Sequence, residues 1–254
     1  MSAAITLTEN QRTKILAFLR RCPGIYARQE AKTVLFIEAV LWMLRSGAGW
    51  ELLPASYGKW NSVYKRYARW CARGIFEHLH ADCATDPDCE YLVLDSTIVR
   101  AHPCAAGAPV AAAEKEQQAL GRSRGGFSTK IHVVVDALGN PLDFVLTAGQ
   151  THDVTQAPAL LHGRHGDYVI ADKGYDASHV IALIEQMGAV PVIPARKNRT
   201  EPREYDRHLY QERHVVECFI NKIKWYRRIF SRFDKLASRY LGFLSFAAAL
   251  IWLR

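Results

Sequence analysis

The chain lacks an apolar run long enough to cross a lipid bilayer. Its most apolar stretch, YLGFLSFAAALIWL near the C-terminus, has about 14 residues, whereas a membrane-spanning helix needs about 20. The first residues, MSAAITLTENQR, also lack the apolar segment of a secretory signal. We therefore predict a cytoplasmic protein with no membrane partner, in which the C-terminal stretch forms a buried helix.

The six cysteines lack the spacing of a disulfide framework, and a chain of 254 residues does not need one to fold. We therefore expect reduced thiols. The stretch HLHADCATDPDC offers His78, His80, Cys83 and Cys89 as zinc ligands, but its spacing matches no common zinc site, so zinc is disfavoured. The glycine-rich segment GRSRGG does not match the GxxxxGK[ST] pattern, and we predict no nucleotide cofactor.

Acidic residues are outnumbered by basic ones. The chain has 25 Asp and Glu against 33 Lys and Arg, which gives a formal net charge of +8 and a pI near 9.2. Such an excess favours a polyanionic partner, most commonly nucleic acid, because basic side chains neutralise phosphates and release counterions. The charge indicates a class of partner but no particular site.

The first third of the chain is predicted to be helical. Thr8, with Gln11 three residues later, is a capping-box signal for a helix that ends at Pro23 and Gly24. A second helix is expected from about residue 29 to 45. The stretch KWNSVYKRYARWCARG then forms a third helix, with an apolar stripe at i, i+3, i+4 spacing and basic residues largely off that stripe.

Two helices, a short turn and a basic third helix suggest a helix-turn-helix domain that binds DNA, over residues 1–88. The alternative is a plain helical bundle with a solvated basic face, since no set of base-reading residues can be identified. If the domain binds DNA, the contacts on the third helix are Lys65, Arg66, Arg69 and Arg73.

From residue 89 onward, short apolar runs typical of strands appear. The runs YLVL, DYVIADKGYD and VPVIPA and the hairpin KIHVVVDALGNPLDFVLTAG are interrupted by one helix, DASHVIALIEQMG. The order strand, hairpin, strand, helix, strand, helix predicts a mixed α/β sheet with flanking helices over residues 89–254. A long connection separates the first strand from the hairpin, and we expect residues 101–129 to form a mobile loop.

The stretch YQERHVVECFINKIKW sets one acid among basic residues on one face of a helix. At about 100° per residue, Tyr210, Arg213, Glu217 and Lys224 share a stripe about 60° wide. The opposite, apolar face consists of Val216, Phe219, Ile223, Tyr226 and Phe230. One interpretation is a surface helix with ordinary charge pairs. The other is a site where the acid binds metal and the basic residues bind phosphate.

Two aspartates favour the second interpretation. Asp95 and Asp172 each follow an apolar strand, where a carboxylate is costly without a partner and where α/β sheets gather their sites. With Glu217 they offer hard oxygen ligands for Mg²⁺ or Mn²⁺, and two such ions can activate the attacking oxygen and stabilise the leaving oxygen of a phosphodiester. Three other acids receive structural interpretations, as a turn residue (Asp136) and as helix caps (Asp153 and Asp176).

These residues resemble those of a known family. Tyr210, Arg213, Glu217 and Lys224 reproduce the Y-x2-R-x3-E-x6-K signature of the insertion-sequence-five family of bacterial DDE transposases. LDSTIVRAH, GRSRGGFSTKIHVVVDALGNPL, LTAGQTHD and ADKGYD also resemble blocks of that family, and LRSGAGWELLPASYGKWNSVYKRYARW resembles its helical leader. The resemblance covers nearly the whole chain.

The resemblance implies a ribonuclease-H-like catalytic domain that follows the helical leader. Its catalytic, metal-binding triad would be Asp95, Asp172 and Glu217, with two Mg²⁺ or Mn²⁺ ions. Contacts to DNA phosphates would come from Tyr210, Arg213 and Lys224.

The implied activity is hydrolysis at the terminal inverted repeats of the element, followed by transfer of the 3′-hydroxyl ends to target DNA. A homodimer or larger synaptic assembly would carry it out, associated with the nucleoid when bound to DNA. One alternative is a related nuclease that cuts without joining. The other is a non-catalytic DNA-binding protein, which would have no use for three well-placed acids.

Overall fold

The computed structural model describes residues 5–107, 118–123, 125–197, 199 and 203–254. By internal packing the chain divides into two compact units, Met1–Thr85 with Ile223–Arg254, and Asp86–Lys222. Within the described ranges, no helix is long and apolar enough to cross a membrane.

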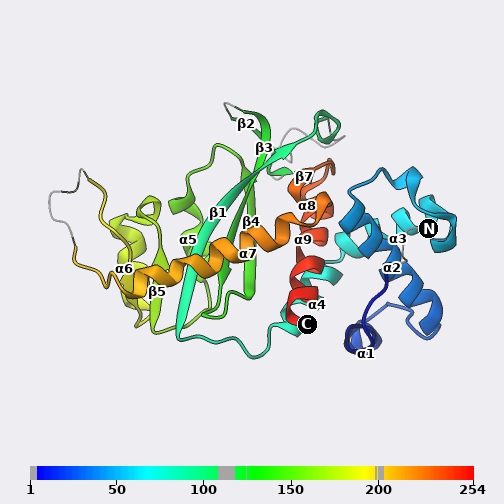
Figure 1. The fold of residues 1–254 in the computed structure, drawn as a ribbon, viewed down its shortest axis with the longest axis horizontal. Helices are drawn as coiled ribbons and strands as arrows, with labels where there is room; N and C mark the ends of the chain where they lie inside the picture. Colours follow the sequence, from blue (N-terminus) through cyan, green and yellow to red (C-terminus); the bar gives the residue numbers. More distant parts are fainter. Residues whose placement is uncertain (1–4, 108–117, 124, 198, 200–202) are drawn as a thin grey trace. The chain divides into compact units, whose positions relative to one another are not determined.

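The first unit is mainly helical (Figure 1). Its elements are α1 (Glu9–Arg21), α2 (Glu30–Ser46), η1 (Trp50–Leu52), η2 (Ala55–Tyr57), α3 (Trp60–Ala72), α4 (Ile75–Cys83), α8 (Arg227–Phe230), β7 (Ser231–Arg232) and α9 (Ala237–Trp252). The three predicted N-terminal helices are confirmed. The additional helix α4 lies in the stretch that was considered for zinc.

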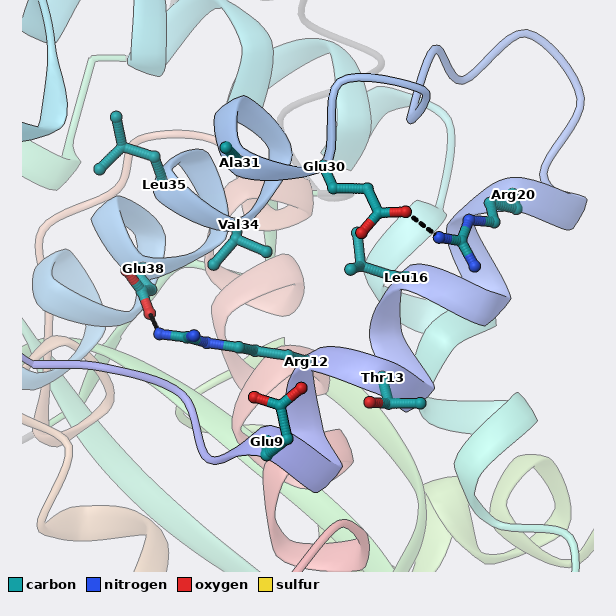
Figure 2. Close-up of a pocket in the computed structure, with 10 residues that line it drawn as sticks. All are labelled: Glu9, Arg12, Thr13, Leu16, Arg20, Glu30, Ala31, Val34, Leu35 and Glu38. Atoms are coloured by element: carbon teal, nitrogen blue, oxygen red, sulfur yellow. Dashed lines mark hydrogen bonds and ion pairs between the residues drawn. The ribbon is translucent and has the colours of Figure 1, made fainter.

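The predicted capping box opens α1. Thr8 Oγ1 accepts the N–H of Gln11 at 3.3 Å, and Gln11 Oε1 accepts the N–H of Thr8 at 3.0 Å. Between α1 and α2 lies a cavity of about 500 Å³ (Figure 2). Two ion pairs connect the helices across it, Arg12 with Glu38 at 3.0 Å and Arg20 with Glu30. Each arginine of this cavity therefore has a carboxylate partner.

The C-terminal stretch forms the predicted buried helix, α9, which packs against α3 and α4. The rings of Tyr67 and Phe243 lie 4.5 Å apart, and a Cβ on Gly242 would come within 2.6 Å of Cys71 Sγ. Because of this close packing, α9 belongs to the helical unit, which differs from the predicted extent of the second domain, 89–254. The boundary near residue 88 stays a prediction.

The second unit is built on a mixed sheet with strand order β2-β3-β1-β5-β6, and β4 also pairs with β3. Its strands are β1 (Tyr91–Ala101), β2 (Gly121–Ser123), β3 (Gly126–Val135), β4 (Pro141–Ala148), β5 (Tyr168–Ala171) and β6 (Val190–Val192). β3 is antiparallel to β1, β2 and β4, whereas β5 is parallel to β1 and β6. The predicted mixed α/β architecture is confirmed.

Helices lie on both faces of this sheet. They are η3 (Pro103–Ala105), η6 (Asp153–Gln156), α5 (Ala157–Leu161), η7 (Lys173–Tyr175), α6 (Ser178–Gln186), η8 (Leu209–Arg213) and α7 (His214–Lys224). On one face, Leu94 and Val134 share a core with Leu160 of α5 and Ile184 of α6. On the other, Phe144 of β4 stacks on Phe219 of α7, with ring centroids 6.0 Å apart, and α7 crosses the strands in Figure 1.

The hairpin between β3 and β4 closes on Asp136. This buried carboxylate accepts the N–H groups of Leu138 at 3.0 Å and Asn140 at 2.7 Å through Oδ1. Burial of the charge is tolerated because these backbone groups replace its water. The predicted turn role of Asp136 is confirmed.

β1 is longer than predicted. The run at 91–94 was expected to end at Asp95, but the strand continues to Ala101 because its second half pairs with β3 up to Arg100↔Ser128. Asp95 therefore lies inside a strand. The expected loop at 101–129 is shorter for the same reason, since β2 and the start of β3 fall within it. Residues 108–117 and 124 of that loop lie outside the described residues, and its mobility stays a prediction.

The helix expected over 210–230 is divided in the structure. Tyr210 and Arg213 lie in the 3-10 helix η8, α7 follows, and a break after Lys224 precedes the short α8. The predicted apolar residues up to Ile223 are buried, but Phe230 is 63% exposed. The helical spacing that placed Phe230 on the apolar face does not continue through the break.

Candidate active site

Asp95 lies within β1, and Asp172 directly follows the adjacent parallel strand β5. Leu94 pairs with Ala171, so the residues that follow share one level of the sheet. Asp172 keeps an extended backbone, with φ −75° and ψ 170°. Adjacent strands lie about 4.8 Å apart and side chains alternate between faces. Both aspartates therefore point away from the core around Leu94 and towards the face that α7 covers.

Arg213 links these acids to Glu217. Its Nη1 lies 3.0 Å from Asp95 Oδ2, and its Nη2 donates to Glu217 Oε1. Arg213 and Glu217 are four residues apart, so they meet one helical turn from each other. This contact is consistent with the prediction that Arg213 and Glu217 share one face of a helix. Their catalytic and DNA-binding roles stay predictions.

The turn that carries Tyr210 and Arg213 begins at Asp206. Oδ1 of Asp206 accepts the N–H groups of Leu209 at 2.9 Å and His208 at 2.8 Å. These two hydrogen bonds lower the pKa of Asp206. An aspartate that accepts the first free N–H groups of a helical turn fixes where the turn starts, and here it fixes the position of Tyr210 and Arg213.

The acidic cluster holds more negative charge than Arg213 neutralises. Burial raises the pKa of Asp95, and the charges of Asp172 and Glu217 raise it further, against the opposing effects of the Ser96 N–H and Arg213. Burial lowers the pKa of Arg213, but the carboxylates raise it by more, so the net shift is upward. A site with three acids and one arginine attracts further positive charge.

The donor chemistry fits a divalent cation. Carboxylate oxygens are the ligands that Mg²⁺ and Mn²⁺ prefer, and Asp95 and Glu217 already converge on one cationic group. Across the described residues, no three His, Cys, Asp or Glu side chains are grouped closely enough to hold a metal ion. Instead, the guanidinium of Arg213 bonds to both Asp95 and Glu217.

The turn after Asp172 is held by Arg196. Asp172 Oδ1 accepts the N–H of Gly174 at 2.8 Å. The guanidinium of Arg196 donates to the carbonyl oxygens of Lys173 at 3.0 Å and Gly174 at 2.6 Å. Arg196 thereby fixes the backbone that orients the Asp172 carboxylate.

Asp176 is not the helix cap that we predicted. α6 begins after Ala177 and has no side-chain cap. Asp176 is 4% exposed, accepts the N–H of Arg196 at 2.8 Å, and pairs with Arg199 and Arg203. A buried carboxylate needs such partners to offset its lost hydration. Asp176 therefore anchors the segment after β6 to the turn that follows Asp172.

Asp153 also differs from the predicted cap, since η6 has no side-chain cap bond. Its Oδ1 accepts from Ser96 Oγ at 2.6 Å, lies 3.0 Å from Lys130 Nζ and lies 3.5 Å from His132 Nδ1. Ser96 follows Asp95 and points to the opposite face of the strand. Asp153 and its three partners therefore support β1 next to Asp95, on the face of the sheet opposite the Asp95 carboxylate.

Two buried polar side chains, His132 and Tyr175, lie close to these residues. Burial lowers the pKa of His132 to about 4, so the imidazole is neutral, and its Nε2 lies 2.8 Å from Thr147 Oγ1. Tyr175 is 1% exposed, and its buried hydroxyl has no hydrogen-bond partner among the described residues. Tyr175 stands three residues after Asp172 in the ADKGYD block, which was the only sequence signal for it.

The remaining predicted DNA contacts lie in the first unit. Lys224 is the last residue of α7, seven residues after Glu217. Lys65, Arg66 and Arg69 lie on α3, and Arg73 follows its last residue. Their contacts to DNA stay predictions.

Two family models match the chain. The model described as "Transposase DDE domain" matches residues 90–252, and the model described as "Putative transposase of IS4/5 family" matches residues 7–80. Together they cover both the predicted leader and the strand-rich part.

Curated relatives give the same family. The chain is 45% identical over 130 residues to "Putative transposase for insertion sequence element IS6501" of Brucella ovis, covering 50% of this chain and 100% of that protein. It is 32% identical over 142 residues to "Putative transposase for insertion sequence element IS402" of Burkholderia cepacia, covering 51% of this chain and 64% of that protein.

A solved structure shares the fold. A piggyBac transposase, determined as a synaptic complex with hairpin DNA, matches with a TM-score of 0.52 and 11% identity. The match covers 98% of this chain and 72% of that one. The predicted ribonuclease-H-like fold class is confirmed by this likeness together with the first family model. The match of residues 7–80 adds a likeness to the IS4/5 family. Since the first model alone spans more than half of the sequence, the chain belongs to the DDE transposases, which are metal-dependent polynucleotidyl transferases.

Proposed function

We propose that the protein binds the terminal inverted repeats of its insertion sequence and hydrolyses the phosphodiester bonds at the element ends. It then transfers the freed 3′-hydroxyl ends to target DNA. The observation that carries this proposal is the convergence of Asp95 and Glu217 on Arg213, beside Asp172. A cluster of acids in a basic protein is of use to an enzyme that handles phosphodiesters and of none to a passive DNA-binding protein.

The catalytic residues in this proposal are Asp95, Asp172 and Glu217, which would hold two Mg²⁺ or Mn²⁺ ions. Such ions, when bound, activate the attacking oxygen and stabilise the leaving oxygen. The chain supplies one carboxylate within β1, one directly after β5 and one adjustable carboxylate on α7, because the Glu217 side chain is 52% exposed. Fixed ligands set the geometry, and the exposed ligand can follow the substrate.

Arg213 has two alternative partners in this mechanism. Without DNA, it neutralises part of the acidic cluster. A phosphate group competes for the same guanidinium, since arginine binds carboxylates and phosphates through the same pair of N–H groups. When Arg213 turns to the phosphate, the carboxylates lose their present counter-charge and become available to metal. Tyr210 and Lys224 would contribute further phosphate contacts.

The partner in this proposal is double-stranded DNA, at both the element ends and the target. The net charge of +8 supports a polyanionic partner. The similar piggyBac structure is a synaptic complex with DNA, which supports a homodimer or larger assembly that brings two ends together. In the leader, DNA contacts are proposed for Lys65, Arg66, Arg69 and Arg73.

The test is cleavage of a labelled duplex that carries the element's end sequence, by wild type and by Asp95→Asn, with Mg²⁺ or with EDTA. We expect nicking at the end that requires metal and is lost in the variant. A second labelled duplex reports joining, and cutting without joining would reduce the function to that of a nuclease. Tight binding of the end without metal-dependent cleavage would overturn the enzymatic proposal.

A further inference from the structure

A second cavity of the first unit, of about 370 Å³, is lined by basic residues. It lies between α3 and the segment that runs from the end of α1 into α2. Its lining residues are Gly24, Ile25, Tyr26, Gln29, Lys32, Thr33, Arg66, Arg69, Trp70 and Arg73. A volume of this size suits a small ligand or a single nucleotide unit.

The charge of this cavity is unbalanced. Four cationic side chains line it, and none of the described lining residues is acidic. Burial lowers the pKa of Arg66, and the neighbouring charge of Arg69 lowers it further, which is the effect of like charges held close together. The cavity between α1 and α2 is different, because Arg12 and Arg20 there each face a glutamate (Figure 2).

Two of the four cations are held in fixed orientations. Arg73 donates to the carbonyl oxygens of Gly24, at 3.0 Å, and Pro23. Arg66 lies over the rings of Phe36, at 4.2 Å, and Trp70, at 5.0 Å. Contacts through the planar face leave the N–H edge of a guanidinium suited to an anion. Side chains that are already ordered lose little entropy when a ligand binds.

We propose that this cavity binds a phosphate group, and that in the cell the phosphate belongs to the backbone of a DNA strand. Arginines with lysine in one concave site recognise phosphate oxygens through charge-assisted hydrogen bonds. The 66% exposed ring of Tyr26 on the rim offers a surface on which the adjoining base stacks. The choice of DNA as the source of the phosphate rests on the proposed function, whereas the phosphate chemistry rests on the cavity.

The basic residues of α3 then divide into two groups. Arg66, Arg69 and Arg73 line the cavity, whereas Lys59, the N-cap residue of α3, is exposed and does not line it. Lys59→Ala therefore removes one charge at the start of the same helix but outside the cavity, which makes it the matched control for Arg69→Ala. Lys32→Ala, on α2, removes a cavity charge without altering α3.

The first arm of the test measures binding of inorganic phosphate to the full-length protein by calorimetry at constant ionic strength, without metal. We expect Arg69→Ala and Lys32→Ala to weaken phosphate binding about tenfold or more, and Lys59→Ala to leave it unchanged. Equal losses in all three variants would overturn the proposal, because net charge alone would explain them. No phosphate binding by wild type would also overturn it.

The second arm identifies the source of the phosphate. Binding of a labelled end duplex is measured against salt concentration, and Arg69→Ala should reduce the logarithmic slope by about one. An unchanged slope together with lost phosphate binding would assign the cavity to a free phosphate compound and overturn the DNA assignment. Both arms are repeated with the Asp95→Asn variant, in which we expect no cleavage. Because neither arm measures cleavage, failure of the proposed enzymatic function is distinguished from failure of this inference.

Discussion

Asp95 and Asp172 stand at one level of the sheet because the residues before them, Leu94 and Ala171, are a parallel pair. Asp95 is held on its other side by β3, where it pairs with Val133. A slip of one residue in either strand would turn a carboxylate to the opposite face. The acidic cluster therefore depends on strand register, and the third acid, Glu217, comes to it through α7.

Replacement of Glu217 separates catalysis from folding. Glu217→Gln should lower the rate of metal-dependent end cleavage by about 100-fold or more, because a metal ligand is lost. The side chain is 52% exposed, so the free energy of unfolding should change by less than about 0.5 kcal/mol. Gel assays of cleavage and urea unfolding measure the two quantities.

The matched control is Glu204→Gln, which removes another exposed acid from the segment before α7. Cleavage by this control should equal that of wild type. If Glu217→Gln cleaves as fast as Glu204→Gln, Glu217 does not belong to the catalytic set.

The sequence predicts those features of the site whose pattern is local, while the catalytic roles of the residues stay predictions. Asp172 follows an apolar strand, and Arg213 and Glu217 stand one helical turn apart. The local sequence pattern alone therefore identifies them as candidate site residues. The roles of Asp153 and Asp176 were wrongly predicted as caps, because a side chain near the start of a helix was assumed to bond to that helix. Their actual partners come from strands and segments far along the chain, which local patterns do not encode.

The length of β1 could not be predicted for a related reason. The apolar run stops before Asp95, and the strand continues only because β3 supplies backbone partners for the polar residues that follow. The packing of α9 is similar. Its apolar composition predicts burial, but the surface that buries it, on α3 and α4, is set by tertiary structure.

Loss of Asp153 should destabilise the second unit. Asp153→Asn removes the negative partner of Lys130, whose side chain is only 11% exposed. An ammonium group left without its counter-charge at such a position costs about 1–3 kcal/mol. Urea unfolding should show a corresponding decrease, and end cleavage should also fall because Ser96, beside Asp95, exchanges a charged carboxylate acceptor for a weaker amide oxygen.

The control for Asp153→Asn is Asp143→Asn. Asp143 pairs with Arg164 at 2.9 Å, but its side chain is 51% exposed, so its loss should cost less than about 1 kcal/mol. Equal destabilisation by the two substitutions would show that the partial burial of the Asp153 network has no energetic consequence.

Arg196 should affect the reaction through the position of Asp172. Arg196→Ala removes the two hydrogen bonds to the carbonyl oxygens of Lys173 and Gly174, and we expect end cleavage to slow about 10- to 100-fold. Arg196→Lys should restore only part of the rate, because an ammonium group does not reproduce the fork of the guanidinium. Binding of the end duplex should change no more than in the exposed control Arg207→Ala. A loss of binding that matches the loss of cleavage would instead assign Arg196 to DNA contact.

Neutral, buried His132 should make the protein sensitive to acid. Its pKa is about 4 in the folded protein against 6.5 for a free imidazole. Between these values the unfolded chain binds a proton that the folded protein excludes, so the free energy of unfolding falls as the pH falls from 6.5 towards 4, by up to about 3 kcal/mol. His132→Gln cannot take up that proton, so its urea-unfolding free energy should depend less on pH over this range than that of wild type, while the exposed control His162→Gln should retain the wild-type profile. Identical pH profiles for wild type and His132→Gln would show that another group causes the loss of stability in acid.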